Sequence, residues 1–285
     1  MSRPEIRDAT AGSDAEALEC CQDEPMGTFG AGEAAWTANL GNLRNTIRQD
    51  LIGRHLSEHV APEASVLDVG CGQGTQAIRL MGRSCAVTGV EPSKDLLHRF
   101  RTDALASGLS PELIEGEIDE LDTLLGNRVF DAVCAHGLLM YLDDPAQAIT
   151  RLAKRVASAG LLSITFKNAH GLAMRPALRG DWTAAVSAFD TSQYVNELGV
   201  DARANRLEEI ESHLAAAGLE VDTWYGVRVF NDAIEASVDP PHNEVLQQIL
   251  EAEDLAGRTD PYRWLGSQFH VIAKRPLIPP DNTAT

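Results

Sequence analysis

The stretch Asp68-Val69-Gly70-Cys71-Gly72-Gln73-Gly74 decides how this sequence folds. It completes a short apolar run of strand character, residues 65–69, and residues 75–82 after it have helical character. Glycines at alternate positions allow a sharp turn and a close approach to a ligand, because no Cβ stands in the way. The stretch therefore predicts a ligand-binding turn between a strand and a helix.

The spacing of these glycines distinguishes two kinds of ligand. A dinucleotide-binding turn has the form G-x-G-x-x-G and requires glycine at position 75, where this chain has Thr75. The form D-x-G-x-G-x-G instead resembles motif I of class I S-adenosylmethionine (SAM)-dependent methyltransferases. Glu91 comes 21 positions after Gly70, at the end of the next predicted strand. A carboxylate at that point is suited to bind both hydroxyls of a ribose.

The segment around Glu91, Gly89-Val90-Glu91-Pro92-Ser93, also resembles these methyltransferases. The resemblance implies SAM as the cofactor, with a nucleotide-binding relative as the alternative. The residues that it implies for the cofactor site are Asp68, Gly70, Cys71, Gly72, Gln73, Gly74, Glu91, Pro92, Ile118 and Asp119. Ile118 and Asp119 follow the third predicted strand, where the adenine contact of the family falls.

Strands and helices alternate through the first two thirds of the chain. The predicted strands are residues 65–69, 85–90, 113–114, 129–135 and 161–166. The first predicted helix starts at residue 39 and ends before Pro62. The other predicted helices are residues 75–82, 94–107 and 145–157. Such alternation is typical of a doubly wound parallel sheet with right-handed crossovers.

The alternation stops after residue 166. A polar insertion at about residues 170–205 precedes a predicted helix at 206–217. Strand patterns at 219–230 and 268–274 flank a helix near 243–256, which suits an antiparallel pair at the edge of the sheet. We therefore expect an α/β fold of the Rossmann-like class I methyltransferase type, with a mostly parallel seven-stranded sheet and helices on both faces.

Composition divides the chain into one large domain and two terminal segments. Residues 8–33 contain seven Asp or Glu and no Lys or Arg, so residues 1–36 are predicted to be an acidic, mobile extension. Residues 37–276 form the predicted methyltransferase domain, and residues 277–285 a C-terminal tail. No apolar run suits a membrane span or a signal peptide, which predicts a cytoplasmic protein without a membrane partner.

Charge and cysteine content restrict the possible partners. The formal net charge of −18 repels nucleic acid, so an RNA substrate would require a local basic patch. The five cysteines show no CxxC or Cys/His spacing, so we expect reduced thiols and no metal. The sequence gives no indication of the oligomeric state.

Four side chains beyond the cofactor loop are predicted to act at the methyl acceptor. His136 follows the fourth strand, where it could take a proton, bind the carboxylate of the cofactor, or only cap the next helix. Asn168 and His170 follow the fifth strand, at the sheet edge from which substrate-facing loops emerge. Arg228 lies in the apolar run 226–230, and its guanidinium requires an acidic partner from the protein or from the substrate.

Three later segments, within residues 168–174, 226–232 and 260–271, resemble the bacterial tRNA 5-carboxymethoxyuridine methyltransferase family. The resemblance implies methylation of a carboxylate on tRNA. It also implies that Arg44 reaches the methionine carboxylate of SAM, that His136 lies at the cofactor, and that Arg228 binds the acceptor carboxylate.

This sequence departs from the family in three places. Glu91 replaces an Asp, Met140-Tyr141 replaces a Glu-Trp pair, and residues 191–206 have only two cations where a lysine-rich stretch is expected. The loss of phosphate contacts weakens RNA binding, so carboxyl methylation is better supported than the tRNA substrate. Two other functions stay open: a small-molecule O- or N-methyltransferase with His136 or His170 as base, and a SAM-binding protein without enzymatic activity.

Overall fold

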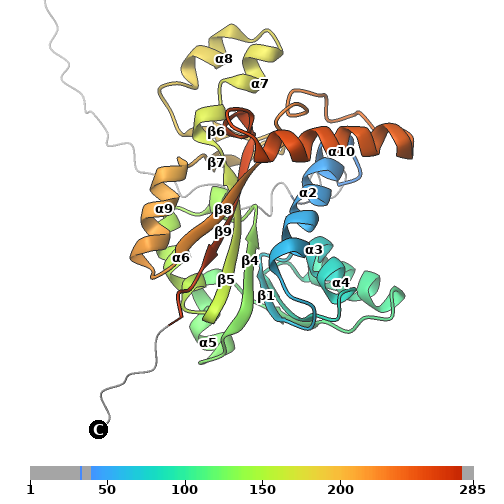
Figure 1. Cartoon of the computed structure of the whole chain (residues 1–285), viewed down its shortest axis with the longest axis vertical. Coiled ribbons are helices and arrows are strands. Elements are labelled where there is room, and N and C mark those ends of the chain that lie inside the picture. Colours follow the sequence, from blue (N-terminus) through green and yellow to red (C-terminus); the bar gives the residue numbers. More distant parts are fainter. Residues whose placement is uncertain (1–32, 34–39, 278–285) are drawn as a thin grey trace, which may run out of the picture.

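A seven-stranded sheet forms the centre of the computed structural model, which describes residue 33 and residues 40–277 (Figure 1). Its order is β3-β2-β1-β4-β5-β9-β8. The strands are β1 (Ser65–Val69), β2 (Ala86–Glu91), β3 (Glu112–Glu115), β4 (Phe130–His136), β5 (Val156–Lys167), β8 (Glu220–Val227) and β9 (Gln268–Lys274). Strands β1 to β5 pair in parallel, and β9 lies antiparallel to both β5 and β8. The predicted mostly parallel seven-stranded sheet is confirmed.

Helices cover both faces of this sheet (Figure 1). One face packs against α2 (Leu43–His59), α3 (Thr75–Met81) and α4 (Lys94–Ala106), and the other against α5 (Leu121–Leu125), α6 (Pro145–Ala153) and α9 (Leu207–Ala216). Neighbouring strand residues divide between the two cores: Val66 contributes to the first and Leu67 to the second. This division follows from the alternation of side chains along a strand.

Two helices begin at side chains that favour a helix start. Ser93 is the N-cap of α4, where its hydroxyl accepts a hydrogen bond from the Leu96 N–H (3.2 Å). Pro145 occupies the first position of α6, and the Asp144 carboxylate before it accepts from the Gln147 N–H (2.9 Å). Both caps satisfy backbone N–H groups that have no partner within the helix.

The predicted boundaries around β5 are wrong by several residues. Helix α6 ends at Ala153, not at 157, and β5 begins at Val156, not at 161. A register irregularity between β4 and β5 inserts extra residues there, and the Phe130 N–H donates to the Arg155 carbonyl (2.8 Å). The pairing partner of this segment, not its own propensity, decides that it is a strand.

The insertion contains elements that its sequence pattern did not indicate. They are α7 (Met174–Leu178), α8 (Trp182–Ser187) and a hairpin of β6 (Gln193–Val195) and β7 (Asp201–Arg203). These elements lie at the top of Figure 1, above the carboxyl ends of the parallel strands. Short elements of this kind depend on tertiary contacts for their stability.

Helix α10 (Asn243–Arg258) lies across α2 near the same end of the sheet (Figure 1). Four 3₁₀ turns complete the described elements: η2 (Ile118–Glu120), η3 (Leu139–Tyr141), η4 (Ala169–Gly171) and η5 (Tyr262–Leu265). Within the described ranges, none of the helices is long and apolar enough to cross a bilayer. The predicted mobile extension and the end of the predicted tail lie outside the described residues, so both stay predictions.

Gly74 gives a test of the packing beneath the glycine loop. Its φ is 79°, and a Cβ there would overlap the ring of Phe100, which is fully buried. We expect Gly74→Ala to lower the free energy of unfolding by about 3 kcal/mol, combining overpacking with a left-handed backbone. Urea denaturation measures this change.

Gly108 is the matched control for this substitution. Its φ is also positive, 71°, but a Cβ there would meet nothing within 4 Å. Gly108→Ala should therefore lower the free energy of unfolding by only about 1 kcal/mol. Equal losses in the two variants would mean that the contact with Phe100 is unimportant.

Candidate functional site

A cavity of about 270 Å³ opens at the carboxyl ends of β1, β2 and β4. Parallel strands bring these ends together at one edge of a sheet, which is where ligands bind in doubly wound folds. Nine of the predicted site residues line the cavity. They are Arg44, Asp68, Gly70, Cys71, Gly72, Glu91, Pro92, His136 and Arg228.

The glycine loop at the floor of the cavity has the geometry that its sequence predicts. Gly70, Gly72 and Gly74 have φ angles of 67°, 54° and 79°, a left-handed conformation that favours glycine. The Gly70 N–H donates to the Val90 carbonyl (2.8 Å) and ties the loop to β2. The thiol of Cys71 is buried, and burial raises its pKa well above the usual value.

Glu91 lies beside this loop, held by two backbone N–H groups. Gly72 donates to its Oε2 (2.9 Å) and Ser93 to its Oε1 (3.0 Å). Burial raises the pKa of Glu91, and these two hydrogen bonds oppose the change. The carboxylate is 6% exposed and forms no ion pair with any cation of the described residues, so it is available to hydroxyl groups of a ligand.

Asp68 is the second buried carboxyl group of this part of the cavity. Burial, reinforced by the charge of Glu91, raises its pKa from 3.8 to about 7. Removing a carboxylate from water disfavours its charged form, and a second carboxylate nearby adds to the effect. Asp68 is therefore partly protonated near neutral pH.

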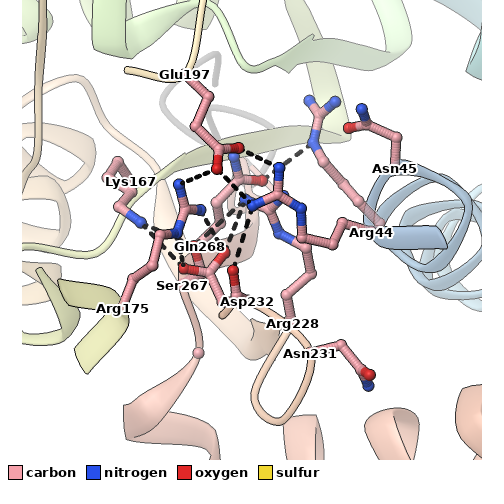
Figure 2. A network of polar contacts seen from close by, with 12 residues as sticks. Arg44, Asn45, Lys167, Arg175, Glu197, Arg228, Asn231, Asp232, Ser267 and Gln268 are labelled. Atoms are coloured by element: carbon pink, nitrogen blue, oxygen red, sulfur yellow. Dashed lines mark hydrogen bonds and ion pairs between the residues drawn. The ribbon is translucent and has the colours of Figure 1, made fainter. Parts of the chain in front are cut away.

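Four cations meet two carboxylates at the other end of the cavity (Figure 2). The Arg44 guanidinium pairs with Glu197, and Arg175 forms two hydrogen bonds with Asp232, of 2.8 and 2.7 Å. Asp232 also lies 3.3 Å from Arg228 Nη2 and 3.8 Å from Lys167 Nζ. The nearby cations hold the pKa of Asp232 well below its usual value, although burial opposes this.

Arg48, Lys167, Arg175 and Glu197 line the cavity but were not predicted from the sequence. Arg48 follows Arg44 by one helical turn on α2, and this spacing is the signal that could have indicated it. Its Nε donates to Gln268 Oε1 (3.0 Å), and burial lowers its pKa to about 10. The other three residues lie at the end of β5 or in the insertion, where no pattern singled them out.

His136 lies at the end of β4 with one ring nitrogen directed away from the cavity. Its Nε2 lies 2.9 Å from Ser163 Oγ on β5. Burial, with a smaller effect from Arg48, lowers its pKa to about 3. The imidazole is therefore neutral at physiological pH.

Six predicted site residues do not line the cavity: Gln73, Gly74, Ile118, Asp119, Asn168 and His170. Ile118 belongs to the hydrophobic core, and Asp119 pairs with Arg151 (2.9 Å). Their assignment to the cofactor stays a prediction.

Asn168 is fully buried, and its amide donates to the carbonyls of Trp264 (2.9 Å) and Gly266 (2.8 Å). The His170 ring is exposed and lies 3.6 Å from Glu208. In this geometry both residues connect η4 to its surroundings and do not face the cavity. Among residue 33 and residues 40–277, no three His, Cys, Asp or Glu side chains group so as to hold a metal ion.

Comparison with known proteins indicates the activity. A family model described as a methyltransferase domain matches residues 66–160. The chain is also 29% identical to tRNA 5-carboxymethoxyuridine methyltransferase of Escherichia coli (strain K12) over 238 residues, which are 83% of this chain and 89% of the relative. The chain is a SAM-dependent methyltransferase. The predicted cofactor, SAM, is thereby confirmed.

A second curated relative and a solved structure are also similar to this chain and are methyltransferases. Ubiquinone biosynthesis O-methyltransferase of Xylella fastidiosa (strain M23) is 27% identical over 187 residues, 65% of this chain and 71% of the relative. The solved structure of magnesium protoporphyrin IX methyltransferase from Synechocystis PCC 6803 with bound SAH has a TM-score of 0.57. It is 15% identical, and the match covers 86% of this chain and 94% of that chain. This structural similarity confirms the class I fold.

The raised pKa of Asp68 predicts a pH-dependent stability of the methyltransferase without its cofactor. A carboxyl group whose pKa is higher in the folded state contributes stability at low pH and loses it as the pH rises. Relative to Asp68→Asn, the wild type should therefore lose stability between pH 4 and pH 7, by at most about 4 kcal/mol. Urea denaturation at pH 4.5 and pH 8 measures the difference.

Glu112→Gln is the control for this experiment. Hydrogen bonds from Arg128 lower the pKa of Glu112 from 4.5 to about 2, so its stabilising contribution grows between about pH 2 and pH 4.5. Between pH 4.5 and pH 8 the effect of Glu112→Gln on stability should therefore be nearly constant. A difference between wild type and Asp68→Asn that is the same at both pH values would contradict the assignment of a raised pKa to Asp68.

Proposed function

We propose that the methyltransferase transfers the methyl group to a carboxylate, and that 5-carboxymethoxyuridine in tRNA is the best candidate. The observation that carries this proposal is the excess of positive charge at one end of the cavity. Arg44, Lys167, Arg175 and Arg228 surround only two carboxylates, Glu197 and Asp232. Cations in a buried site are stabilised by an anion, so a negatively charged acceptor suits this cavity.

Arg228 is the residue that we propose to bind the acceptor carboxylate. Its guanidinium is buried, with Nη2 3.3 Å from Asp232 and 3.3 Å from Ser267 Oγ. Its Nε has no hydrogen-bond partner within the described part of the chain. A buried N–H group without a partner is costly, and a ligand carboxylate would satisfy it.

The backbone at Arg228 supports a functional role. Its φ is 58°, a left-handed conformation that costs free energy for any residue with a Cβ. The buried Glu253 carboxylate stabilises the turn that follows, accepting from the N–H groups of Val229 (2.7 Å), Phe230 (3.0 Å) and Asn231 (2.9 Å). Helix α10 thereby fixes the position from which Arg228 enters the cavity.

The remaining residues of the cavity, together with Arg44, fit SAM. Buried Glu91 is available for the ribose hydroxyls, and Pro92 lies beside it for the adenine. Arg44, from the cation cluster, and Arg48 are available for the methionine carboxylate, which leaves Lys167, Arg175 and Arg228 at the acceptor end. When bound, SAM supplies a methyl group on a positively charged sulfur. The acceptor carboxylate is ionised at neutral pH, so the protein needs to orient it and exclude water but does not need a base.

A histidine-dependent small-molecule methyltransferase is the alternative function. It requires a histidine that takes up a proton near neutral pH. His136 has a pKa of about 3, and His170 does not line the cavity. Both observations favour a carboxylate acceptor over an acceptor that must lose a proton.

The tRNA part of the proposal is supported by the similarity to the Escherichia coli enzyme, which covers 83% of this chain. The net charge of −18 opposes it, because nucleic acid is repelled by such a surface. A tRNA substrate also implies that the methyltransferase works in the cytoplasm, which is part of the same proposal.

Methylation of bulk bacterial tRNA tests the acceptor directly. The tRNA is first treated with mild base to hydrolyse existing methyl esters, then incubated with the methyltransferase and SAM carrying a labelled methyl group. We expect the label on 5-carboxymethoxyuridine after digestion to nucleosides, and its release by a second treatment with base. Labelled nucleosides that resist base, or the absence of label from every nucleoside, would contradict the proposal.

Replacing Arg228 tests the role of the cation. We expect Arg228→Met to lower kcat/KM for the acceptor about 100-fold, because a buried partner of a charged group contributes about 2–5 kcal/mol. The dissociation constant for SAM, measured by calorimetry, should stay within about twofold, since the effect is restricted to the acceptor. Arg101→Met, at an exposed position of α4, is the matched control. An equal loss of SAM affinity in Arg228→Met would assign Arg228 to the cofactor.

A further inference from the structure

A row of polar side chains leads from the cavity across the sheet to α10, with its three middle members buried and its two end members half-buried. It consists of His136, Ser163, His270, His55 and Asp254. These residues come from β4, β5, β9, α2 and α10, so five elements far apart in the sequence contribute one member each. We call this set the histidine row.

Each member of the histidine row lies within reach of the next. Ser163 Oγ is 2.9 Å from His136 Nε2 and 2.8 Å from His270 Nε2. His270 Nδ1 is 2.9 Å from His55 Nδ1. His55 Nε2 is 3.4 Å from Asp254 Oδ1, the distance of an ion pair, and forms no hydrogen bond with any described residue.

The three imidazoles are neutral. His55 is 1% exposed and His270 fully buried, and burial lowers the pKa of both. His136, with its pKa of about 3, is neutral for the same reason. The ring of Tyr225 stacks on His55, with centroids 3.7 Å apart, and holds that imidazole in place. A neutral imidazole has one N–H donor and one bare nitrogen, so each ring is in one of two tautomers.

Asp254 determines which tautomer is favoured along the row. Its pKa is lowered by His55 and Arg258, so it is an ionised carboxylate that only accepts hydrogen bonds. The negative charge of Asp254, 3.4 Å away, favours the tautomer with the hydrogen on His55 Nε2. This tautomer leaves His55 Nδ1 bare to accept from His270 Nδ1–H. The bare His270 Nε2 accepts from the Ser163 hydroxyl. Ser163 Oγ in turn accepts from His136 Nε2–H.

The opposite order of donors and acceptors along the histidine row is unfavourable at its Asp254 end. It would place the bare, buried His55 Nε2 next to the Asp254 carboxylate, so that the lone pair of the nitrogen would face a negative charge. A buried acceptor that faces another acceptor and no donor is unfavourable. The hydrogen bonds of the histidine row therefore have one preferred order of donors and acceptors. Asp254 on α10 sets this order, and it extends to His136 at the cavity.

We propose that Asp254, His55, His270 and Ser163 are positioning residues that fix His136 with Nδ1 bare, as a hydrogen-bond acceptor for the α-ammonium group of SAM. His136 lines the cavity, and its Nδ1 has no hydrogen-bond partner among the described residues. Arg44, Arg48 and Arg228 line the same cavity. In such surroundings a neutral acceptor suits an ammonium group, whereas a protonated imidazole would add another cation. The inference depends on SAM binding alone and not on the identity of the methyl acceptor.

The tautomer of His136 is measured directly by nuclear magnetic resonance. The full-length protein is labelled with ¹⁵N-histidine, and two-bond ¹H–¹⁵N correlations are recorded at pH 7 without ligand. His136→Gln identifies the signals. We expect a bare Nδ1 and a protonated Nε2 on His136. A protonated Nδ1, or two protonated nitrogens, would overturn the proposal whatever the activity of the enzyme.

Asp254→Asn tests whether Asp254 sets the order of donors and acceptors along the histidine row. An amide both donates and accepts, so His136 should become a mixture of tautomers. Binding of S-adenosylhomocysteine, measured by calorimetry, should weaken about 3- to 10-fold, in line with the loss of one hydrogen bond to a charged group. Binding of the analogue without the α-amino group should not change. An unchanged tautomer and unchanged affinity in Asp254→Asn would overturn the proposal.

Glu58→Gln is the matched control, because Glu58 also pairs with Arg258 (2.7 Å) but forms no hydrogen bond or ion pair with His55. It should leave both the His136 tautomer and the affinity for S-adenosylhomocysteine unchanged. Ser163→Ala interrupts the row between His136 and His270. In that background Asp254→Asn should have no further effect on His136, and a persistent effect would mean that the coupling does not pass along the row.

Discussion

The ion pairs of the Asp232 carboxylate are the interactions on which the cationic end of the cavity depends. This carboxylate lies within 3.8 Å of cations from three segments: Lys167 on β5, Arg175 on α7 and Arg228 after β8. Without it these cations would repel one another in a buried site. Its backbone carbonyl also accepts from Arg44 of α2 (3.3 Å). One residue thus connects the sheet, the insertion and the helix before β1.

This arrangement links the charge of the site to the position of the insertion. Glu197, between β6 and β7, pairs with Arg44 and lies 3.4 Å from both Arg175 and Arg179. Buried ion pairs add little to stability, because removing the charges from water offsets their attraction. In the function that we propose, their consequence is specificity: carboxylates of the protein compensate only part of the positive charge, and the remainder would favour an anionic acceptor.

The two ends of the cavity differ in how well the sequence predicts their residues. The glycine loop and Glu91 are close in the chain and follow consecutive strands, so a local pattern was enough to predict both. Arg48 lies one helical turn after Arg44, but this spacing becomes informative only when its partner, Gln268, is known. Asn168 gives the reverse case: its place after β5 suggested chemistry, but its amide is occupied by the carbonyls of Trp264 and Gly266.

The sequence by itself determined the alternation of strands and helices, the mostly parallel sheet and the glycine loop, because these follow from local periodicity and from glycine spacing. The tertiary structure alone decided which charges meet: Glu197 with Arg44, and Asp232 with Lys167, Arg175 and Arg228. It also aligned the histidine row, whose members lie on five different elements. Contacts between distant residues depend on packing, and no local pattern in one sequence encodes which side chains packing brings together.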